Sequence, residues 1–201
     1  LSNGQPCVIR PINGGYVKSD VCIIFGYKKE NTQGKARTKI INAHGDSSSL
    51  IIIERGYVRR DRYYSVGVGH FNGRANFKNG NSPGDRWALL NTKLEDRGWQ
   101  NNRLVLVCGQ VPQDASLINV KYQEWIKKVI TVLKRNTSRE VCFKHHPLAK
   151  DKVKANCRIL NGDLTAILPQ CFATVCYNSN AGVDSILAGV PSLPGDEGSM
   201  V

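Results

Sequence analysis

A short segment in the second half of the chain carries side chains suited to phosphate chemistry. In FKHHPLAK, residues 143–150, Lys144 and His146 come just before Pro147, which holds the residue preceding it in an extended conformation. Lys144 and His146 could face one phosphate together, and His146 could donate a hydrogen bond or a proton to a departing phosphate. The adjacent His145 is interpreted as a packing residue. The segment therefore predicts an anion-binding loop.

A second polar segment, CGQVPQDAS at residues 108–116, directly follows a predicted strand. Gly109 allows the backbone to turn sharply there. The short polar side chains at the position where a ligand would lie are Gln110, Asp114 and Ser116. The alternative is an ordinary strand-to-helix turn in which Ser116 is the cap.

The third segment, TVCYNSNAGVDSILAGVPSL at residues 174–193, has three polar residues between a predicted strand and a predicted helix. They are Asn178, Ser179 and Asn180. One such residue is enough to cap a helix. The others would lie beside unpaired backbone N–H groups at the positive end of the helix dipole, which is an arrangement that binds anions.

The apolar pattern predicts the elements that position these segments. In the second half we expect strands at 104–108, 141–143, 157–160, 173–177 and 190–193, and helices at 120–133, 164–168 and 181–188. This alternation implies a parallel sheet covered on both faces, with ligands at the carboxyl ends of its strands.

In the first half, we expect strands at 21–25, 39–43 and 50–53, a long glycine-rich functional loop at 57–84 and a linker at 91–102. We therefore predict an α/β protein of two domains, residues 1–100 and 101–201.

Taken in this order, the three segments resemble the C-terminal domain of the capsule-type Kdo transferases. They are also similar to bacterial sialyltransferases with an HP motif and a Ser-Ser motif, and the resemblance covers about residues 103–193. It implies a glycosyltransferase of the GT-B type, with two Rossmann-like domains whose parallel sheets face a cleft. It also implies that His146, Ser179 and Asn180 hold the phosphates of a nucleotide-sugar donor.

The first half departs from the Kdo-transferase pattern, so the resemblance does not carry over a donor sugar. Residues 50–77, together with GQVPQDAS, are instead similar to glycosyltransferase-like proteins encoded by bacteriophages and bacteria. In a GT-B enzyme the C-terminal domain binds the donor and the N-terminal domain binds the acceptor. We expect the nucleotide sugar to be a co-substrate and no further cofactor to be needed.

The catalytic base is open among three residues, and the same sequence predicts no metal site. An inverting transfer would need Asp46, Glu54 or His70 beside the acceptor hydroxyl. A turn residue is the alternative for Asp46, and an ion-pair partner of a nearby arginine is the alternative for Glu54. There is no DxD-like run, and the four histidines have no metal-ligand spacing with the cysteines.

The charge balance points to an anionic partner. Lys and Arg number 28 against 16 Asp and Glu, a net charge of +12, although a solvated basic surface is the alternative. The predicted nucleic-acid contacts are Arg55, Arg59, Arg60, Arg62 and Arg74. A hydroxymethylated DNA base in a phage genome is the first acceptor candidate, and a glycan or lipid-linked saccharide of the bacterial surface is the second. A third interpretation is a DNA- or nucleotide-binding protein without activity.

The seven cysteines are odd in number, contain no CxxC pair and fall mostly in apolar runs, so we expect buried thiols in a reducing cytosol. No apolar stretch reaches the roughly 18 residues of a membrane span, and no signal-peptide pattern is present. We therefore expect the chain to act in a cytoplasm, its own or that of a bacterial host.

Overall fold

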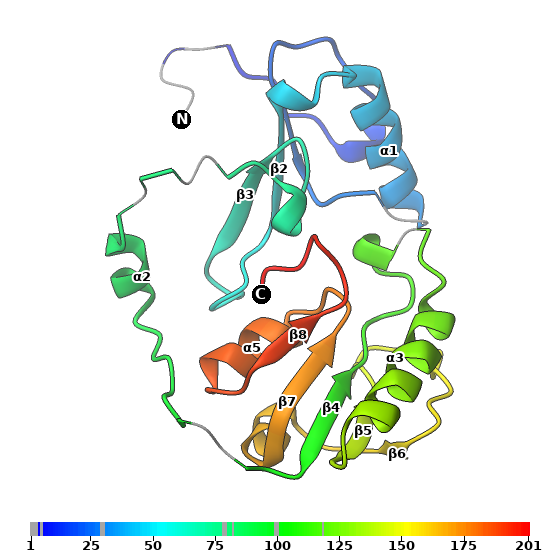
Figure 1. The fold of residues 1–201 in the computed structure, drawn as a ribbon. Helices are drawn as coiled ribbons and strands as arrows, with labels where there is room; N and C mark the ends of the chain where they lie inside the picture. The colour runs from blue at the N-terminus through cyan, green and yellow to red at the C-terminus, as the bar shows by residue number, and fades with distance from the viewer. Residues whose placement is uncertain are drawn as a thin grey trace.

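The computed structural model describes residues 4, 6–28, 31–77, 80–81, 83–98, 101–117 and 119–201. These residues form two β-sheets, one in each half of the chain, with helices packed against them (Figure 1). The strands are β1 (Cys22–Phe25), β2 (Leu50–Arg55), β3 (Tyr64–Val68), β4 (Leu104–Cys108), β5 (Glu140–Lys144), β6 (Arg158–Ile159), β7 (Cys171–Cys176) and β8 (Ser192–Pro194). The α-helices are α1 (Thr32–His44), α2 (Asp85–Leu90), α3 (Tyr122–Asn136), α4 (Leu164–Ile167) and α5 (Ala181–Leu187). The 3₁₀ helices are η1 (Ile12–Gly14), η2 (Ser47–Ser49), η3 (Asn72–Arg74), η4 (Ala115–Leu117) and η5 (Leu168–Gln170).

The second sheet is parallel throughout and has the order β6-β5-β4-β7-β8. Its central strand β4 is buried at every position, as expected for a strand covered on both faces. Leu106 packs towards α4 and η5, whereas Val107 packs towards Ile126 of α3. In Figure 1, α3 and α5 lie on opposite sides of this sheet. The predicted parallel sheet, covered on both faces, is confirmed.

Helix α3 forms one of these covers because its apolar residues recur at helical spacing. Tyr122, Ile126 and Ile130 are four residues apart, and all three are buried against the sheet. The helix ends at Thr137, where the backbone becomes extended. The sequence prediction of a helix at 120–133 is confirmed, with bounds shifted by a few residues.

The first sheet is mixed, so the prediction of two parallel sheets is correct only for the second. Strand β1 pairs with β2 in parallel, but β3 pairs with β2 in antiparallel orientation. The connection from β2 to β3 is residues 56–63, which is shorter than the dozen or more residues that a parallel crossover needs. A turn of this length can only return the chain beside β2.

One face of the first sheet packs on α1, and the other face is open. Ile24 and Ile52 are buried together with Ile40 of α1. On the opposite face, Ile23, Phe25, Tyr64 and Val66 remain exposed, and Phe25 contacts Tyr64 edge to face. The described part of the first half is thus a sheet with a helix on one face only.

Two predicted segments of the first half differ from the structure. Residues 39–43, predicted as a strand, lie inside α1, which Asn31 caps through a hydrogen bond from Gly34 N and Gly45 ends in a left-handed conformation. The predicted loop at 57–84 contains β3 and η3, and α2 follows it directly. Residues 78, 79 and 82 of that loop, and residues 99 and 100 of the predicted linker, lie outside the described residues.

All seven cysteines are free thiols, and five of them are buried, while Cys157 is half-buried and Cys7 is exposed. No helix among the described residues is both long and apolar enough to cross a membrane.

After β8 the chain turns back towards the first half. In Figure 1 this C-terminal segment, residues 195–201, runs between the two sheets and ends beside the first half. Gly73 N donates a hydrogen bond to Gly198 O at 2.9 Å, and Arg74 pairs with Asp196. The C-terminal segment therefore joins the two halves by direct contacts.

Candidate functional site

A cleft of about 1100 Å³ separates the two halves, which exceeds the volume of a typical small-molecule pocket. The first half lines it with the carboxyl end of β2 and the loop that follows. The second half lines it with the loops after β4, β5 and β7, and Figure 1 shows the arrowheads of β4 and β7 pointing towards the first half. This is the position that the parallel-sheet rule assigns to a ligand. The polar and charged lining residues are Glu54, Arg55, Tyr57, Arg60, Asn72, Gln110, Asp114, Lys144, His145, His146, Asp163, Asn178, Ser179, Asn180 and Asp184.

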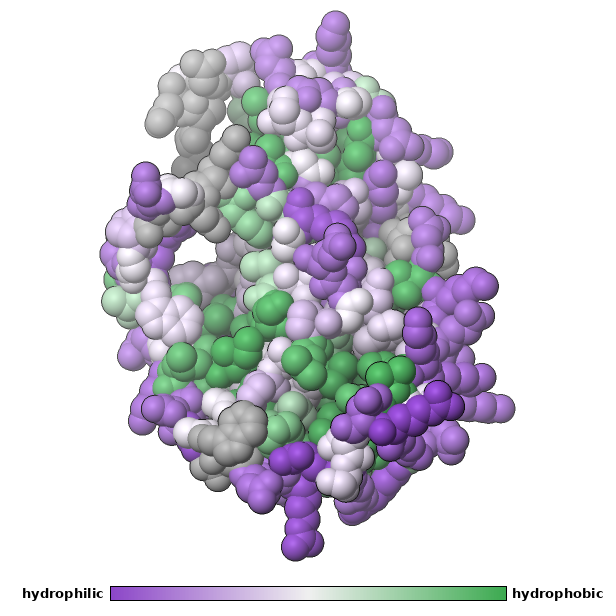
Figure 2. Space-filling view, in the orientation of Figure 1, coloured by the Kyte–Doolittle hydropathy of each residue, from purple (hydrophilic) through white to green (hydrophobic). Residues whose placement is uncertain are grey.

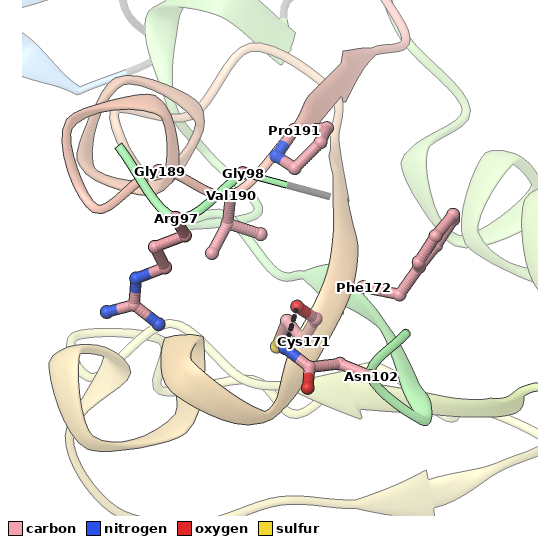
Figure 3. A pocket seen from close by; sticks show the side chains of 8 residues that line it. All are labelled: Arg97, Gly98, Asn102, Cys171, Phe172, Gly189, Val190 and Pro191. Carbon is pink, nitrogen blue, oxygen red and sulfur yellow. Dashed lines mark hydrogen bonds between the residues drawn. The ribbon is translucent and has the colours of Figure 1, made fainter. Parts of the chain in front are cut away.

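Two other surface features are poorer candidates. The crevice in Figure 3 lies at the opposite end of β7, where Asn102 Nδ2 donates to Cys171 O at 3.1 Å, and it holds about 20 Å³, the space of a single water molecule. Figure 2 shows an apolar band over α5 and β8, where Ile186 and Leu193 are exposed, but neither residue lines the cleft. The cleft is therefore the candidate site.

The loop after β5 brings Lys144 and His146 to the cleft, as the sequence predicted. Leu148 N donates to His146 Nδ1 at 3.1 Å, so the neutral ring carries its proton on Nε2. The pKa of His146 is lowered below its usual range, mainly by burial, although the negative charge of Asp114 raises it. The positive charges of Lys144 and Arg60 lower this pKa further. At neutral pH the ring is therefore an uncharged donor through Nε2.

His145 packs as predicted, although it also lines the cleft. Its ring meets Phe143 edge to face, with centroids 5.0 Å apart. Burial lowers the pKa of His145, and the charges of Lys152 and Lys144 add to this effect.

Gly109 brings the ends of β4 and β5 together. Its N–H donates to Lys144 O at 2.7 Å, and a Cβ at this position would lie 2.8 Å from the same oxygen. No side chain fits there without separating the strands. Gly109 is thus required for the close approach of the two strand ends, and its hydrogen bond fixes the backbone that precedes His146.

The side chains of the β4 loop bond mainly to each other. Gln110 is 6% exposed, and its Nε2 donates to Ser116 Oγ at 2.5 Å while its Oε1 accepts from Asn178 N at 3.2 Å. Asp114 Oδ1 accepts from both N and Oγ of Ser116, at 3.0 and 2.8 Å. The capping residue is therefore Asp114 and not Ser116. Ser116 does not line the cleft, and Gln110 holds two loops together.

The three polar residues of the loop after β7 make different contacts. Asn178 is held by three hydrogen bonds, from its N to Gln110, from its Nδ2 to Asp196 and to its Oδ1 from Asn72. Ser179 Oγ accepts from Ala181 N, the first N–H of α5, at 3.3 Å.

Asn180 leaves a polar atom for a ligand. Its Nδ2 donates to Asp184 Oδ1 at 3.1 Å, but its buried Oδ1 has no hydrogen-bond partner among the described residues. Buried polar atoms in folded proteins nearly always have partners, so such an atom in a cleft wall marks a contact that a ligand can complete.

Asp184, which was not predicted as a site residue from the sequence, also lines the cleft. Burial raises the pKa of Asp184, although the hydrogen bond from Asn180 and the charge of Arg60 lower it. Its position four residues after Asn180 was a usable signal, because residues i and i+4 share a helix face.

Of the three predicted bases, Glu54 lies in the cleft and the other two do not. Asp46 caps η2, and hydrogen bonds from Ser49 and Ser48 lower its pKa to about 2. His70 packs on the ring of Tyr27, with centroids 4.6 Å apart, and burial lowers its pKa. Asp46 and His70 thus have structural contacts outside the cleft lining, in contrast to Glu54.

The five predicted nucleic-acid contacts differ in their surroundings. Arg55 and Arg60 line the cleft, and Arg62 is exposed near Asp61. Arg59 donates to Asn91 O at 3.0 Å. The guanidinium of Arg74 is bound to Asp196. Within the described part of the chain, no group of three His, Cys, Asp or Glu residues is arranged to hold a metal ion.

No protein-family model matches this sequence, and no curated protein matches it significantly. The structure is similar to two solved Kdo transferases of KpsC from Thermosulfurimonas dismutans. The β-Kdo 2,4 transferase is 14% identical, with 86% of this chain and 69% of that chain covered and a TM-score of 0.56. The β-Kdo 2,7 transferase is 15% identical, with 87% and 64% covered and a TM-score of 0.52. At these identities the likeness concerns the fold, and this chain has the GT-B-like α/β fold of those Kdo transferases.

Proposed function

We propose that this chain is a nucleotide-sugar-dependent glycosyltransferase, whose donor binds the second half of the cleft and whose acceptor binds the first half. The observation that carries the proposal is the meeting of Lys144, His146 and Arg60 in one cleft at the carboxyl ends of parallel strands. The similarity of the fold to two Kdo transferases supports it.

On the donor side, the phosphate of the nucleotide sugar would lie between Lys144 and His146 Nε2. Lys144 supplies a full positive charge, and the neutral His146 supplies a directed hydrogen bond. Both interactions grow stronger as the bond from the sugar to the phosphate breaks and negative charge collects on the departing oxygen. These side chains, together with Arg60, provide the stabilisation that a divalent metal provides in other transferases.

On the acceptor side, Glu54 is the candidate base for an inverting transfer. It stands at the carboxyl end of β2, on the cleft wall that the first half provides. Its carboxylate would take the proton of the acceptor hydroxyl while that oxygen bonds to the anomeric carbon. The bond between the anomeric carbon and the donor phosphate breaks, and its electrons leave with the phosphate. Of the three bases predicted from the sequence, only Glu54 lines the cleft, which supports this choice.

A saccharide of the bacterial surface is the favoured acceptor, because both similar structures are named as Kdo transferases. A hydroxymethylated DNA base, the first choice from the sequence, becomes the second candidate. It is favoured by the net charge of +12 and by the exposed side chains of Arg59, Arg60 and Arg62 in the loop beside the cleft. Either acceptor would be modified in a bacterial cytoplasm, and the DNA acceptor would belong to a phage infection.

The test is incubation of the full chain with a panel of nucleotide sugars and three acceptors, followed by mass spectrometry of the products. The acceptors are a Kdo-containing oligosaccharide, hydroxymethylated duplex DNA and unmodified duplex DNA. We expect transfer to one of the first two and none to unmodified DNA. The matched variants are Lys144→Ala, which removes a cleft charge, and Arg158→Ala, which removes an exposed one outside the cleft.

Loss of transfer in Lys144→Ala, with transfer retained in Arg158→Ala, supports the assigned donor site. Binding of a nucleotide sugar without transfer to any acceptor would favour the non-catalytic interpretation. Failure of the chain to bind any nucleotide sugar would refute the proposed function.

A further inference from the structure

A hydrogen-bonded network connects the first half, the C-terminal segment and the wall of the cleft. Arg74 donates two hydrogen bonds to Asp196, from Nη1 to Oδ2 at 2.8 Å and from Nη2 to Oδ1 at 2.5 Å. Asn178 Nδ2 donates to Asp196 Oδ2 at 2.6 Å. The side chain of Asp196 is only 5% exposed, so the pair is shielded from water on the carboxylate side.

We propose that Asp196 is a positioning residue, which holds the cleft loop 178–180 in place through Asn178 when Arg74 of the first half is docked on it. The assignment deepens the proposed function, because loop 178–180 is part of the wall assigned to the nucleotide-sugar donor. Asp196 itself does not line the cleft.

The geometry of Asn178 explains how Asp196 can act at a distance. The backbone N of Asn178 donates to Gln110 Oε1 at 3.2 Å, and its Oδ1 accepts from Asn72 Nδ2 at 3.2 Å. Asn72 is oriented in turn by Tyr57, whose hydroxyl donates to Asn72 Oδ1 at 2.8 Å. Because its Nδ2 is also bound to Asp196, the side-chain amide of Asn178 is held in one orientation. The backbone that leads to Ser179 is therefore held in place as well.

Two glycines show that the docking is tight. A Cβ on Gly73 would lie 2.5 Å from Ser199 O, and a Cβ on Gly198 would overlap the guanidinium of Arg74. The backbones of η3 and of the C-terminal segment therefore touch without intervening side chains. A side chain added at Gly73 must push the C-terminal segment, and Asp196 with it, away from the first half.

The network links two features of the structure, which are the contact between the two halves and the ordered conformation of loop 178–180. If the halves separate, Arg74 and Asn72 leave together, and Asp196 and Asn178 each lose a partner. A ligand that binds the ordered loop therefore favours the closed arrangement, and closure favours the ligand by the same factor.

The experiment uses two variants that disturb the network differently and one matched control. Asp196→Asn keeps the size of the side chain and removes its charge. Gly73→Ala opens the junction and leaves Asp196 and Asn178 unchanged. Glu140→Gln is the control, because it also turns an arginine-paired carboxylate into an amide, at the exposed contact with Arg158.

Calorimetry with the nucleotide sugar that the wild type binds best, melting temperature and hydrogen exchange of residues 178–184 are measured for all four proteins. We expect both network variants to lose about tenfold in affinity, the effect of one charge-assisted hydrogen bond, and to exchange these amides faster than the control. Arg74→Ala should have the same effect, and the double variant Arg74→Ala, Asp196→Asn should lose little more than either alone.

Affinity and exchange in Asp196→Asn equal to those in Glu140→Gln would overturn the proposal. A lower melting temperature with unchanged affinity and exchange would also overturn it, because the pair would then be a structural ion pair only. If the wild type binds no nucleotide sugar, the proposed function fails by itself. The exchange rates of residues 178–184 still decide the role of Asp196 in that case.

Discussion

Nucleotide-sugar affinity should increase as the pH is lowered from 7.5 to 5.5, and His146→Gln should abolish this increase. Burial, together with nearby Lys144 and Arg60, lowers the pKa of His146, so the ring of the free protein is neutral at pH 7.5. A bound phosphate favours the protonated ring and raises this pKa in the complex. Affinity therefore grows as the pH falls between the pKa of the complex and that of the free protein, and is constant below the latter.

The size of the effect follows from two opposing changes at the ring. A charge pair about 4 Å apart is worth about 1 kcal/mol in water and about 4 kcal/mol at an effective dielectric constant of about 20. Protonation of Nδ1 removes the hydrogen bond from Leu148 N, which costs about 1 kcal/mol. The net gain lies between about 0 and 3 kcal/mol, and its midpoint corresponds to about tenfold in affinity.

Calorimetric titration at intervals of half a pH unit measures this gain. The ligand must be a nucleotide sugar whose phosphates are esterified on both sides, because a terminal phosphate itself titrates near pH 6. Titration in two buffers of different ionisation enthalpy counts the protons taken up on binding. His44→Gln is the control, since His44 lies outside the cleft and bonds to Tyr16 and Ser49.

Equal pH dependence in wild type and His146→Gln would refute the reasoning, because the titrating group would then be another one. Affinity of the wild type that stays constant from pH 7.5 to 5.5 would also refute it. In that case the ring either lies too far from the phosphate, or the free energy lost with the hydrogen bond from Leu148 N equals the free energy gained from the charge pair.

Four further outcomes are expected. Transfer activity should survive EDTA, because cationic side chains of the cleft stabilise the phosphate; loss in chelator that Mg²⁺ or Mn²⁺ restores would contradict this. If DNA is the acceptor, replacing Arg59, Arg60 and Arg62 with Ala should flatten the log–log salt dependence of filter binding by up to about one unit per lost phosphate contact, whereas equal slopes would exclude these arginines. Ile126→Ala should lower the free energy of unfolding in urea by about 2–5 kcal/mol, because Ile126 is 0% exposed; a loss below about 1 kcal/mol would mean that the core relaxes. Burial raises the pKa of Asp196, but its hydrogen bonds lower this pKa by more, so the folded-state pKa lies below the unfolded pKa of about 3.9. The carboxylate therefore stabilises the fold fully above the unfolded pKa, and this stabilisation is lost as the pH falls through the folded-state pKa. Acid titration of unfolding should therefore show a smaller loss in Asp196→Asn, and an equal loss would exclude the ion pair as its source.

The second sheet could be predicted from the sequence because its strands are continuous apolar runs. Leu104–Cys108 is apolar at every position, and burial on both faces requires this of a central parallel strand. The spacing of Tyr122, Ile126 and Ile130 fits only a helix with one buried face. In both cases a local pattern contains all the information that the element needs.

The first half was predicted less well because its local signals are ambiguous. Ile40 and Ile41 form a short apolar run that suits a strand or a helix, and the caps Asn31 and Gly45 decide for the helix. Strand β3 includes Gly67, where a Cβ would overlap Ala75, so its glycine serves close packing and not a loop. The sequence shows the glycine but not the neighbour that requires it.

The sequence by itself determined which polar residues follow each strand of the second sheet. Parallel strands end at one edge, so Lys144, His146 and Asn180 had to lie near each other once the strands were identified. Only the tertiary structure decided which polar side chains face the ligand and which hold the loops. Asn178 is tied by partners from three segments, and Arg74 meets Asp196 across 122 residues, a contact that no local pattern encodes. Hydrogen-bond partners are chosen by proximity in the folded chain, and these partners, which come from distant segments, become neighbours only in the tertiary structure.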